Sequence, residues 1–217
     1  MSEKRKMTFW QKVENFWYYN KWFVAFGVLV VVSLIIGALV IIDNSTDNAS
    51  DLRVLSAYTQ ALTNEEYDID IRLNDGLKDV NGDGKINATL TPFYITEGLT
   101  TDTDKISQSQ LEAEFQYCNG DILLFDKPNL DLFLKKDIFA PIGEYLDLSC
   151  VPDEDIVYKN DVAVAIKLSD SKILKDMKFT TDEVFVSIMF MPDNSTEETL
   201  FYRENAKTAI KKLLEKN

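Results

Sequence analysis

The longest apolar stretch of the chain runs from Trp22 to Ile42 and contains no charged residue. At a rise of about 1.5 Å per residue, about 20 such residues cross the ~30 Å hydrocarbon core of a bilayer. A buried helix of a soluble protein is one alternative, but such a helix is seldom apolar on every face over this length. A cleaved signal peptide is another, but this run exceeds the usual ~7–15 apolar residues and no small-x-small site follows it. The pattern therefore predicts an uncleaved transmembrane helix over residues 22–42.

The segment that precedes this span, residues 1–21, has apolar side chains spaced for one face of a helix. The spacing i, i+1, i+4, i+7 and i+8 is typical of an amphipathic helix at a lipid interface, and further aromatic residues lead into the span. Interfacial anchoring is the simpler interpretation, and docking of a partner protein is the alternative. Membrane lipid is thus the partner expected for residues 9–42. The residues concerned are Phe9, Trp10, Val13, Phe16, Trp17, Tyr18, Tyr19 and Trp22.

Residues 43–51 are short, polar and turn-prone and predict a linker, after which strand-like and helix-like patterns alternate over residues 52–217. This alternation predicts one α/β domain, with helices flanking a mixed or mainly parallel sheet. Strands are expected over 53–59, 87–95, 121–125, 162–167 and 183–191. Helices are expected over 63–76, 103–118, 129–136, 169–175 and, after a capping box from Ser195 to Glu198, through Leu214.

The charges on the two sides of the apolar span predict its orientation. Five basic residues precede the span, whereas the first charged residues after it are Asp43, Asp47 and Asp51. The positive-inside rule places the N-terminus in the cytoplasm and the domain outside. Residues 43–217 hold 34 acidic and 18 basic residues, a net charge of −16, which favours solubility. The basic residues before the span are Lys4, Arg5, Lys6, Lys12 and Lys21.

Composition excludes several classes of function. The chain of 217 residues has a net charge of −13, which argues against nucleic acid, because phosphates need a basic surface. It contains no histidine, so a Ser-His-Asp hydrolase and a histidine-ligated metalloenzyme are both excluded. A glycine-rich phosphate-binding loop is also missing from the sequence.

The clearest chemical motif lies between a predicted helix and a predicted strand, at residues 79–87. Oxygen-bearing side chains occupy positions 1, 3, 5 and 9 of this loop, and a glycine occupies position 6, as in an EF-hand-type calcium loop. A hard cation needs six to eight oxygens, and this odd spacing turns successive side chains inward. We expect Gly84 to permit the turn and Ile86 to tie the loop to the core. The predicted ligands are Asp79, Asn81, Asp83, Asn87 and the backbone carbonyl of Lys85.

This nine-residue loop resembles the calcium loops of dockerin modules. It departs from their pattern at position 12, where Leu90 stands in place of an acidic ligand, and a strand rather than a helix is predicted to follow. Asp75 and Glu97 are the candidates for the missing acid. An Asp/Asn/Gly-rich turn without a metal is the alternative, and Ca2+ is the cofactor that we expect.

Other candidate sites have simpler structural explanations. Ser169 and Lys172 match a Ser-x-x-Lys pattern, but the companion motifs of penicillin-recognising enzymes are missing, and Ser169 is more simply a helix N-cap. The acidic groups at residues 68–70 and 153–155 are more simply solvated loop charges than acid/base pairs. No catalytic residue is therefore predicted. Cys118 and Cys150 lie outside the cell on this topology, where a disulfide is allowed but not required.

Residues 111–148 resemble a segment of extracellular solute-binding proteins, in which a helix leads to a short strand ending in Asp, a second helix and a loop. The corresponding residues here are 121–126, the helix through Phe133, and 139–142. Residues 15–32 also resemble the entry to single-span membrane proteins of Gram-positive bacteria that carry such a domain. The resemblance implies a bacterial surface protein whose domain is like one lobe of a periplasmic-binding-protein-like fold. A complete binding protein has two lobes, whereas residues 43–217 suffice for one.

Three functions follow as hypotheses. The first is a non-enzymatic, membrane-anchored binding or assembly domain on the cell surface, stiffened by calcium and contacting a membrane or surface protein. The second is a solute-recognition subunit of an ABC-type importer, with an aromatic-lined pocket that uses Phe93, Tyr94 and Tyr117. The third is an enzyme that uses carboxylates or a metal-bound water, and it would require buried acidic residues in a cleft.

Overall fold

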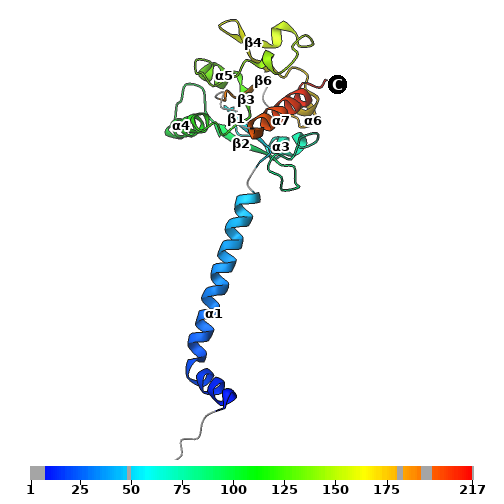
Figure 1. Ribbon diagram of the computed structural model, residues 1–217. Helices are drawn as coiled ribbons and strands as arrows, with labels where there is room; N and C mark the ends of the chain where they lie inside the picture. The colour runs from blue at the N-terminus through cyan, green and yellow to red at the C-terminus, as the bar shows by residue number, and fades with distance from the viewer. Residues whose placement is uncertain (1–7, 48–49, 180–182, 192–196, 217) are drawn as a thin grey trace, which may run out of the picture. The chain divides into compact units, whose positions relative to one another are not determined.

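The computed structural model describes residues 8–47, 50–179, 183–191 and 197–216, which belong to two compact units, Met1–Ala49 and Ser50–Asn217. The first unit is a single helix, α1 (Phe9–Asp47), shown in blue in Figure 1. Its Phe9–Ala38 stretch is long and apolar enough to cross a membrane, and none of it is buried. An apolar helix this close to the N-terminus is compatible with a membrane anchor or with a signal sequence. The helix includes the predicted amphipathic segment and continues into the predicted linker as far as Asp47.

The second unit is built on one six-stranded sheet with the order β2-β1-β3-β6-β5-β4 (Figure 1). The β1 strand lies between β2 and β3 and runs parallel to both, whereas β6, β5 and β4 complete the sheet with antiparallel pairs. The sheet is therefore mixed, as the sequence pattern predicts. The strands are β1 (Leu52–Tyr58), β2 (Ala88–Tyr94), β3 (Ile122–Asp126), β4 (Ile156–Lys159), β5 (Val162–Lys167) and β6 (Val184–Ile188).

Helices cover both faces of this sheet, because alternate residues of the central strands point to opposite sides. On one face, Leu52 and Val54 of β1 pack in a core with α3 and the C-terminal helix α7. On the other face, Leu55 and Ala57 pack in a second core with α4 and α5. The helices are α2 (Asn64–Tyr67), α3 (Ile69–Leu73), α4 (Asp102–Gln116), α5 (Lys127–Phe133), α6 (Lys172–Asp176) and α7 (Glu197–Leu213), with 3-10 turns at Ile142–Glu144 and Asp153–Asp155.

Capping residues explain where several of these helices begin. Thr63 and Glu66 form a reciprocal capping box at α2, and Thr101 and Asp104 form another at α4. The side chain of Asp126, the last residue of β3, accepts a hydrogen bond from the Asn129 backbone N–H and begins α5 directly after the strand. As a result, α5 begins two residues earlier than the sequence pattern predicts.

Several local features differ from the predictions. The helix predicted over 63–76 is two short helices, α2 and α3. The sequence pattern does not predict the short strand β4, because its four residues show too little alternation of apolar and polar side chains. Ser169 is not a helix N-cap, since α6 begins after Ser171 and the Ser169 hydroxyl donates to Asp155 Oδ1 at 2.6 Å. Ile86 is 43% exposed and does not tie the loop to the core. The predicted capping box of the last helix begins at Ser195, outside the described residues.

Candidate functional site

The predicted calcium loop connects α3 to β2 and lies where the parallel strands β1 and β2 begin. Gly82 and Gly84 have φ angles of +73° and +80°, and no heavy atom lies close to where a Cβ would be placed on either. The two glycines are therefore required for their left-handed backbone and not for space. They fold the loop back on itself, as the glycine pattern predicts.

Within this loop, the side-chain oxygens turn inward onto the loop's own backbone. The two carboxylate oxygens of Asp79 accept the N–H groups of Gly82 and Gly84 at 2.6 and 2.9 Å. Asn81 Oδ1 accepts the Asp83 N–H at 2.9 Å, and Asp83 Oδ1 accepts the Lys85 N–H at 2.7 Å. Three of the five predicted ligand residues thus point their oxygens into one turn.

Asp51 lies beneath the loop and is completely buried. Its Oδ1 accepts the Val80 N–H at 2.7 Å, and its Oδ2 accepts the Asn87 N–H at 2.9 Å. The Asp51 N–H in turn donates to the Asn87 carbonyl at 2.8 Å. This single carboxylate therefore binds both ends of the loop.

Sequence reasoning assigned Asp51 to the linker and missed this role. The signal that would reveal it is the parallel pairing of β1 with β2, in which Leu52 lies opposite Ala88. That register places the residue before β1 beside the residue before β2, which is Asn87. Without knowledge of the pairing, the two positions are 36 residues apart and unconnected.

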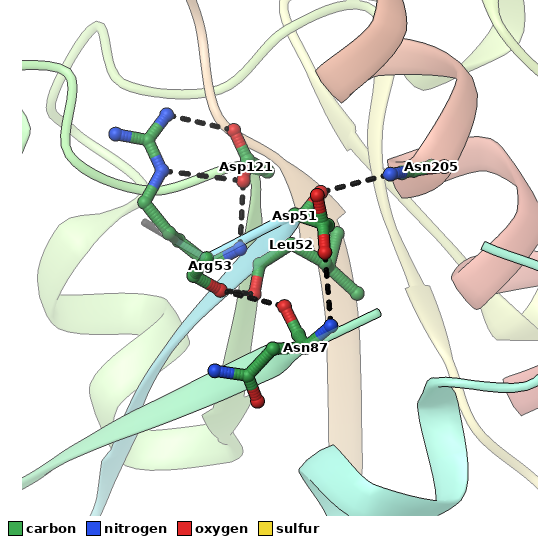
Figure 2. A network of polar contacts seen from close by, with 7 residues as sticks. Asp51, Leu52, Arg53, Asn87, Asp121 and Asn205 are labelled. Carbon is green, nitrogen blue, oxygen red and sulfur yellow. Dashed lines mark hydrogen bonds and ion pairs between the residues drawn. The ribbon is translucent and has the colours of Figure 1, made fainter. Parts of the chain in front are cut away.

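Asn205 of α7 joins the same network from the other side (Figure 2). Its side-chain amide donates to the Asp51 and Lys78 carbonyls, each at 2.9 Å, and its Oδ1 accepts the Lys78 N–H at 2.8 Å. Asn205 is 1% exposed, and its hydrogen bond to the Asp51 carbonyl is buried. The network connects the loop to the C-terminal helix as well as to the sheet.

An ion pair continues the network toward β3. The Arg53 guanidinium contacts both oxygens of Asp121, and the Arg53 N–H donates to Asp121 Oδ2 at 2.7 Å (Figure 2). Burial raises the pKa of the Asp121 carboxyl, and the charge of Arg53 opposes that rise. The Arg53 guanidinium also lies 4.9 Å from the ring centroid of Tyr202 on α7. Three separate chain segments therefore meet at the start of β1.

Neither candidate for the missing acidic ligand reaches the loop. Asp75 pairs with Lys212 of α7 at 3.2 Å and is exposed. Glu97 follows the far end of β2, seven residues of strand away from the loop, which is about 20 Å or more. The side chain of Asn87 is exposed and points away from Asp51 (Figure 2). Of the two candidates for the missing acid, Asp75 is thus paired with Lys212, and Glu97 follows the far end of β2.

The loop offers the type of ligand that a hard cation prefers, because every candidate ligand atom is a carboxylate, amide or carbonyl oxygen. Among the described residues, no three His, Cys, Asp or Glu side chains converge as a metal-binding group. Asp79 and Asp83 are the two carboxylates that the loop itself offers. A site with few charged ligands binds calcium weakly. A calcium ion held by this loop would therefore be bound with low affinity.

The remaining candidates have structural roles. Asp155 is mostly buried and accepts the Ser169 hydroxyl, whereas Asp70 accepts the N–H of its neighbour Ile71. Cys118 and Cys150 are both free thiols.

The three aromatic residues suggested for a ligand pocket lie in different surroundings. Tyr117 is 75% exposed, Phe93 is buried in the core, and Tyr94 shares a 2.6 Å hydrogen bond with Tyr67.

The chain matches no protein-family model, and neither the curated proteins nor the solved structures contain a significant match to it.

Proposed function

We propose that the Ser50–Asn217 unit is a non-enzymatic binding or assembly domain, held at the outer surface of a cell membrane by α1 and stiffened by calcium in the loop 79–87. The observation that carries this proposal is the loop with its Asp51 support. Its oxygens are gathered into one turn, and that turn is fixed to the sheet and to α7. A cation bound there stabilises a junction between three elements.

The location follows from α1 and the charges beside it. Five basic residues precede the apolar stretch and acidic residues follow it, so the positive-inside rule favours a cytoplasmic N-terminus. Outside the cell, calcium is abundant, and a site with two carboxylates and a Kd of about 10⁻⁴–10⁻³ M is sufficiently strong. The acidic charge of the domain adds a general attraction for cations.

The calcium part of the proposal is tested by calorimetric titration of the purified full chain in detergent, combined with thermal unfolding. We expect saturable binding and, at ten times Kd, a stabilisation of about 1.4 kcal/mol. For a domain of this size that corresponds to a rise of about 3–6 °C in Tm. EDTA should reverse the rise.

A double variant, Asp79→Asn with Asp83→Asn, should abolish binding, because it removes both carboxylates of the loop while keeping an oxygen acceptor at each position. Asp75→Asn is the matched control, since Asp75 lies near the loop in sequence but pairs with Lys212. Absence of calcium binding to the wild-type chain, or equal binding to the double variant, would remove the metal from the proposal.

A second candidate function is solute recognition for an ABC-type importer. It is favoured by the order of elements in residues 102–144, where α4, β3, α5 and a 3-10 turn follow one another as in the solute-binding segment that these residues resemble. Co-purification of the full chain with a membrane permease would support this function, and its absence under conditions that preserve such complexes would count against it.

A further inference from the structure

A cavity of about 220 Å³ lies within the connection between β5 and β6. Its apolar lining comes from Leu168, Leu174, Phe179 and Val184. Val184 pairs with Asp126, so the cavity lies at the end of the sheet where the parallel strand β3 ends. In open α/β sheets, this end is the usual place for a ligand. The calcium loop lies at the opposite end, where β1 and β2 begin.

One buried hydroxyl in the lining lacks a partner. Ser171 is 2% exposed, and its Oγ has no hydrogen bond within the described part of the chain. Its backbone carbonyl is already used, because it accepts the Lys175 N–H at 3.1 Å. An unpaired buried hydroxyl is costly, and a ligand oxygen in the cavity satisfies it once the Ser171 side chain turns its Oγ toward the cavity.

The charged residues of the lining leave one positive charge in excess. Lys175 is neutralised by Asp170, with Nζ and Oδ1 2.7 Å apart. Lys178 also lines the cavity and has no ion-pair partner among the described residues. One excess ammonium group beside an apolar wall is complementary to a small monoanion with an apolar body.

The backbone at Lys178 suits a residue without a Cβ. Lys178 follows the end of α6 with a φ angle of +51°, a position that helices commonly give to glycine. Glycine fits this conformation without strain, so the Lys178 side chain can be removed there without disturbing the backbone.

We propose that this cavity binds a small carboxylate with a branched aliphatic body, with its charge beside Lys178 and an oxygen accepting from the Ser171 hydroxyl. The proposal gives the binding domain a ligand class and rests on that part of the proposed function alone. Calcium binding at the loop can fail without affecting it, because the two sites share no residue.

The test is equilibrium dialysis of the full chain in nanodiscs against 3-methylbutanoate, with its neutral counterpart 3-methylbutanamide and empty nanodiscs as references. We expect saturable uptake of the carboxylate and binding of the amide that is about tenfold weaker, as the loss of one charge-assisted hydrogen bond implies. No uptake above empty nanodiscs, or equal affinity for the amide, overturns the proposal.

Two variants locate the binding. Lys178→Gly should fold at least as well as the wild type, since glycine suits the positive φ, yet bind the carboxylate about tenfold more weakly. Ser171→Ala should weaken binding by a smaller factor. Lys172→Ala is the control, because Lys172 is exposed on α6 and does not line the cavity. Wild-type affinity in Lys178→Gly, or an equal loss in Lys172→Ala, overturns the assignment to this cavity.

Discussion

A buried carboxylate needs hydrogen-bond donors, and the donors to Asp51 are backbone N–H groups. The N–H groups of Val80 and Asn87 approach it from the two ends of one loop, so a single side chain closes that loop. The proposed effect of calcium is to strengthen an arrangement that the hydrogen bonds of Asp51 also stabilise.

Replacing Asp51 should therefore destabilise the domain with or without calcium. We expect Asp51→Asn to lower the free energy of unfolding by about 2–3 kcal/mol, because one carboxylate oxygen is exchanged for a donor that faces backbone N–H groups. Urea denaturation of the full chain in detergent, with added calcium and with EDTA, measures the change. The exposed Asp75→Asn should cost under about 1 kcal/mol. Equal losses in the two variants would contradict the role of Asp51.

Asp104 is a second residue whose charge the fold favours. Its carboxylate accepts the N–H and hydroxyl groups of both Thr96 and Thr101. The hydrogen bond from the Thr96 N–H and the hydroxyl bonds of both threonines lower the pKa of Asp104 well below its ordinary value. Because the folded pKa lies below the unfolded one, the stabilisation is present above about pH 4 and is lost as the pH falls further.

We predict that Asp104→Asn lowers Tm near neutral pH and that its deficit relative to the wild type shrinks below about pH 4. Thermal unfolding across this pH range measures the deficit. Asp102→Asn is the control from the same helical turn, since the Asp102 side chain is 94% exposed. A deficit that stays constant with pH would show that the charge of Asp104 does not stabilise the fold.

At the scale of elements, the patterns of period two and of helical spacing predict most of the sheet and the longer helices. The run at 162–167 coincides with β5, and the helix predicted over 103–118 corresponds to α4. What the patterns could not supply is which strands are neighbours. The support of the loop by Asp51 and Asn205 depends on that pairing, so the candidate site was only half predictable. The inward direction of the loop oxygens follows from the spacing within residues 79–87 and was predicted. The support from Asp51 and Asn205 comes from residues distant in the sequence and was not predicted.

Close contacts between elements also cannot be predicted from local sequence patterns, and Gly120 is an example. A Cβ at this position would lie 2.7 Å from Leu55 Cδ1 of β1. The connection from α4 to β3 therefore lies close against the Leu55 side chain of the central strand, and any residue larger than glycine requires that side chain to move.

Gly120→Ala should accordingly cost about 1–3 kcal/mol of unfolding free energy, because Leu55 must move within a packed core. Gly143→Ala is the matched control, since a Cβ there meets Leu148 Cδ1 at an ordinary 3.5 Å. Urea denaturation of both variants gives the comparison. Indistinguishable midpoints and slopes would show that β1 and this connection are less closely packed than described.

At the scale of the whole molecule, the chain combines a helix that can span a membrane with an acidic α/β domain that carries a loop of inward-facing oxygens. On the proposed topology, the loop faces surroundings in which calcium is abundant, so even a weak site there would be filled. The small-molecule cavity lies at the other end of the sheet, so the two proposed sites can be tested independently. Orientation across the membrane is thus the central claim.

Protease treatment of intact cells that express the full chain tests this claim most directly. A C-terminal epitope tag reports the fate of the domain, and a cytoplasmic protein in the same cells reports their integrity. The account predicts that the tagged domain is degraded or released from intact cells while the cytoplasmic marker survives. Protection of the domain until the cells are lysed would contradict the proposed orientation and, with it, the calcium-rich surroundings on which the proposed function depends.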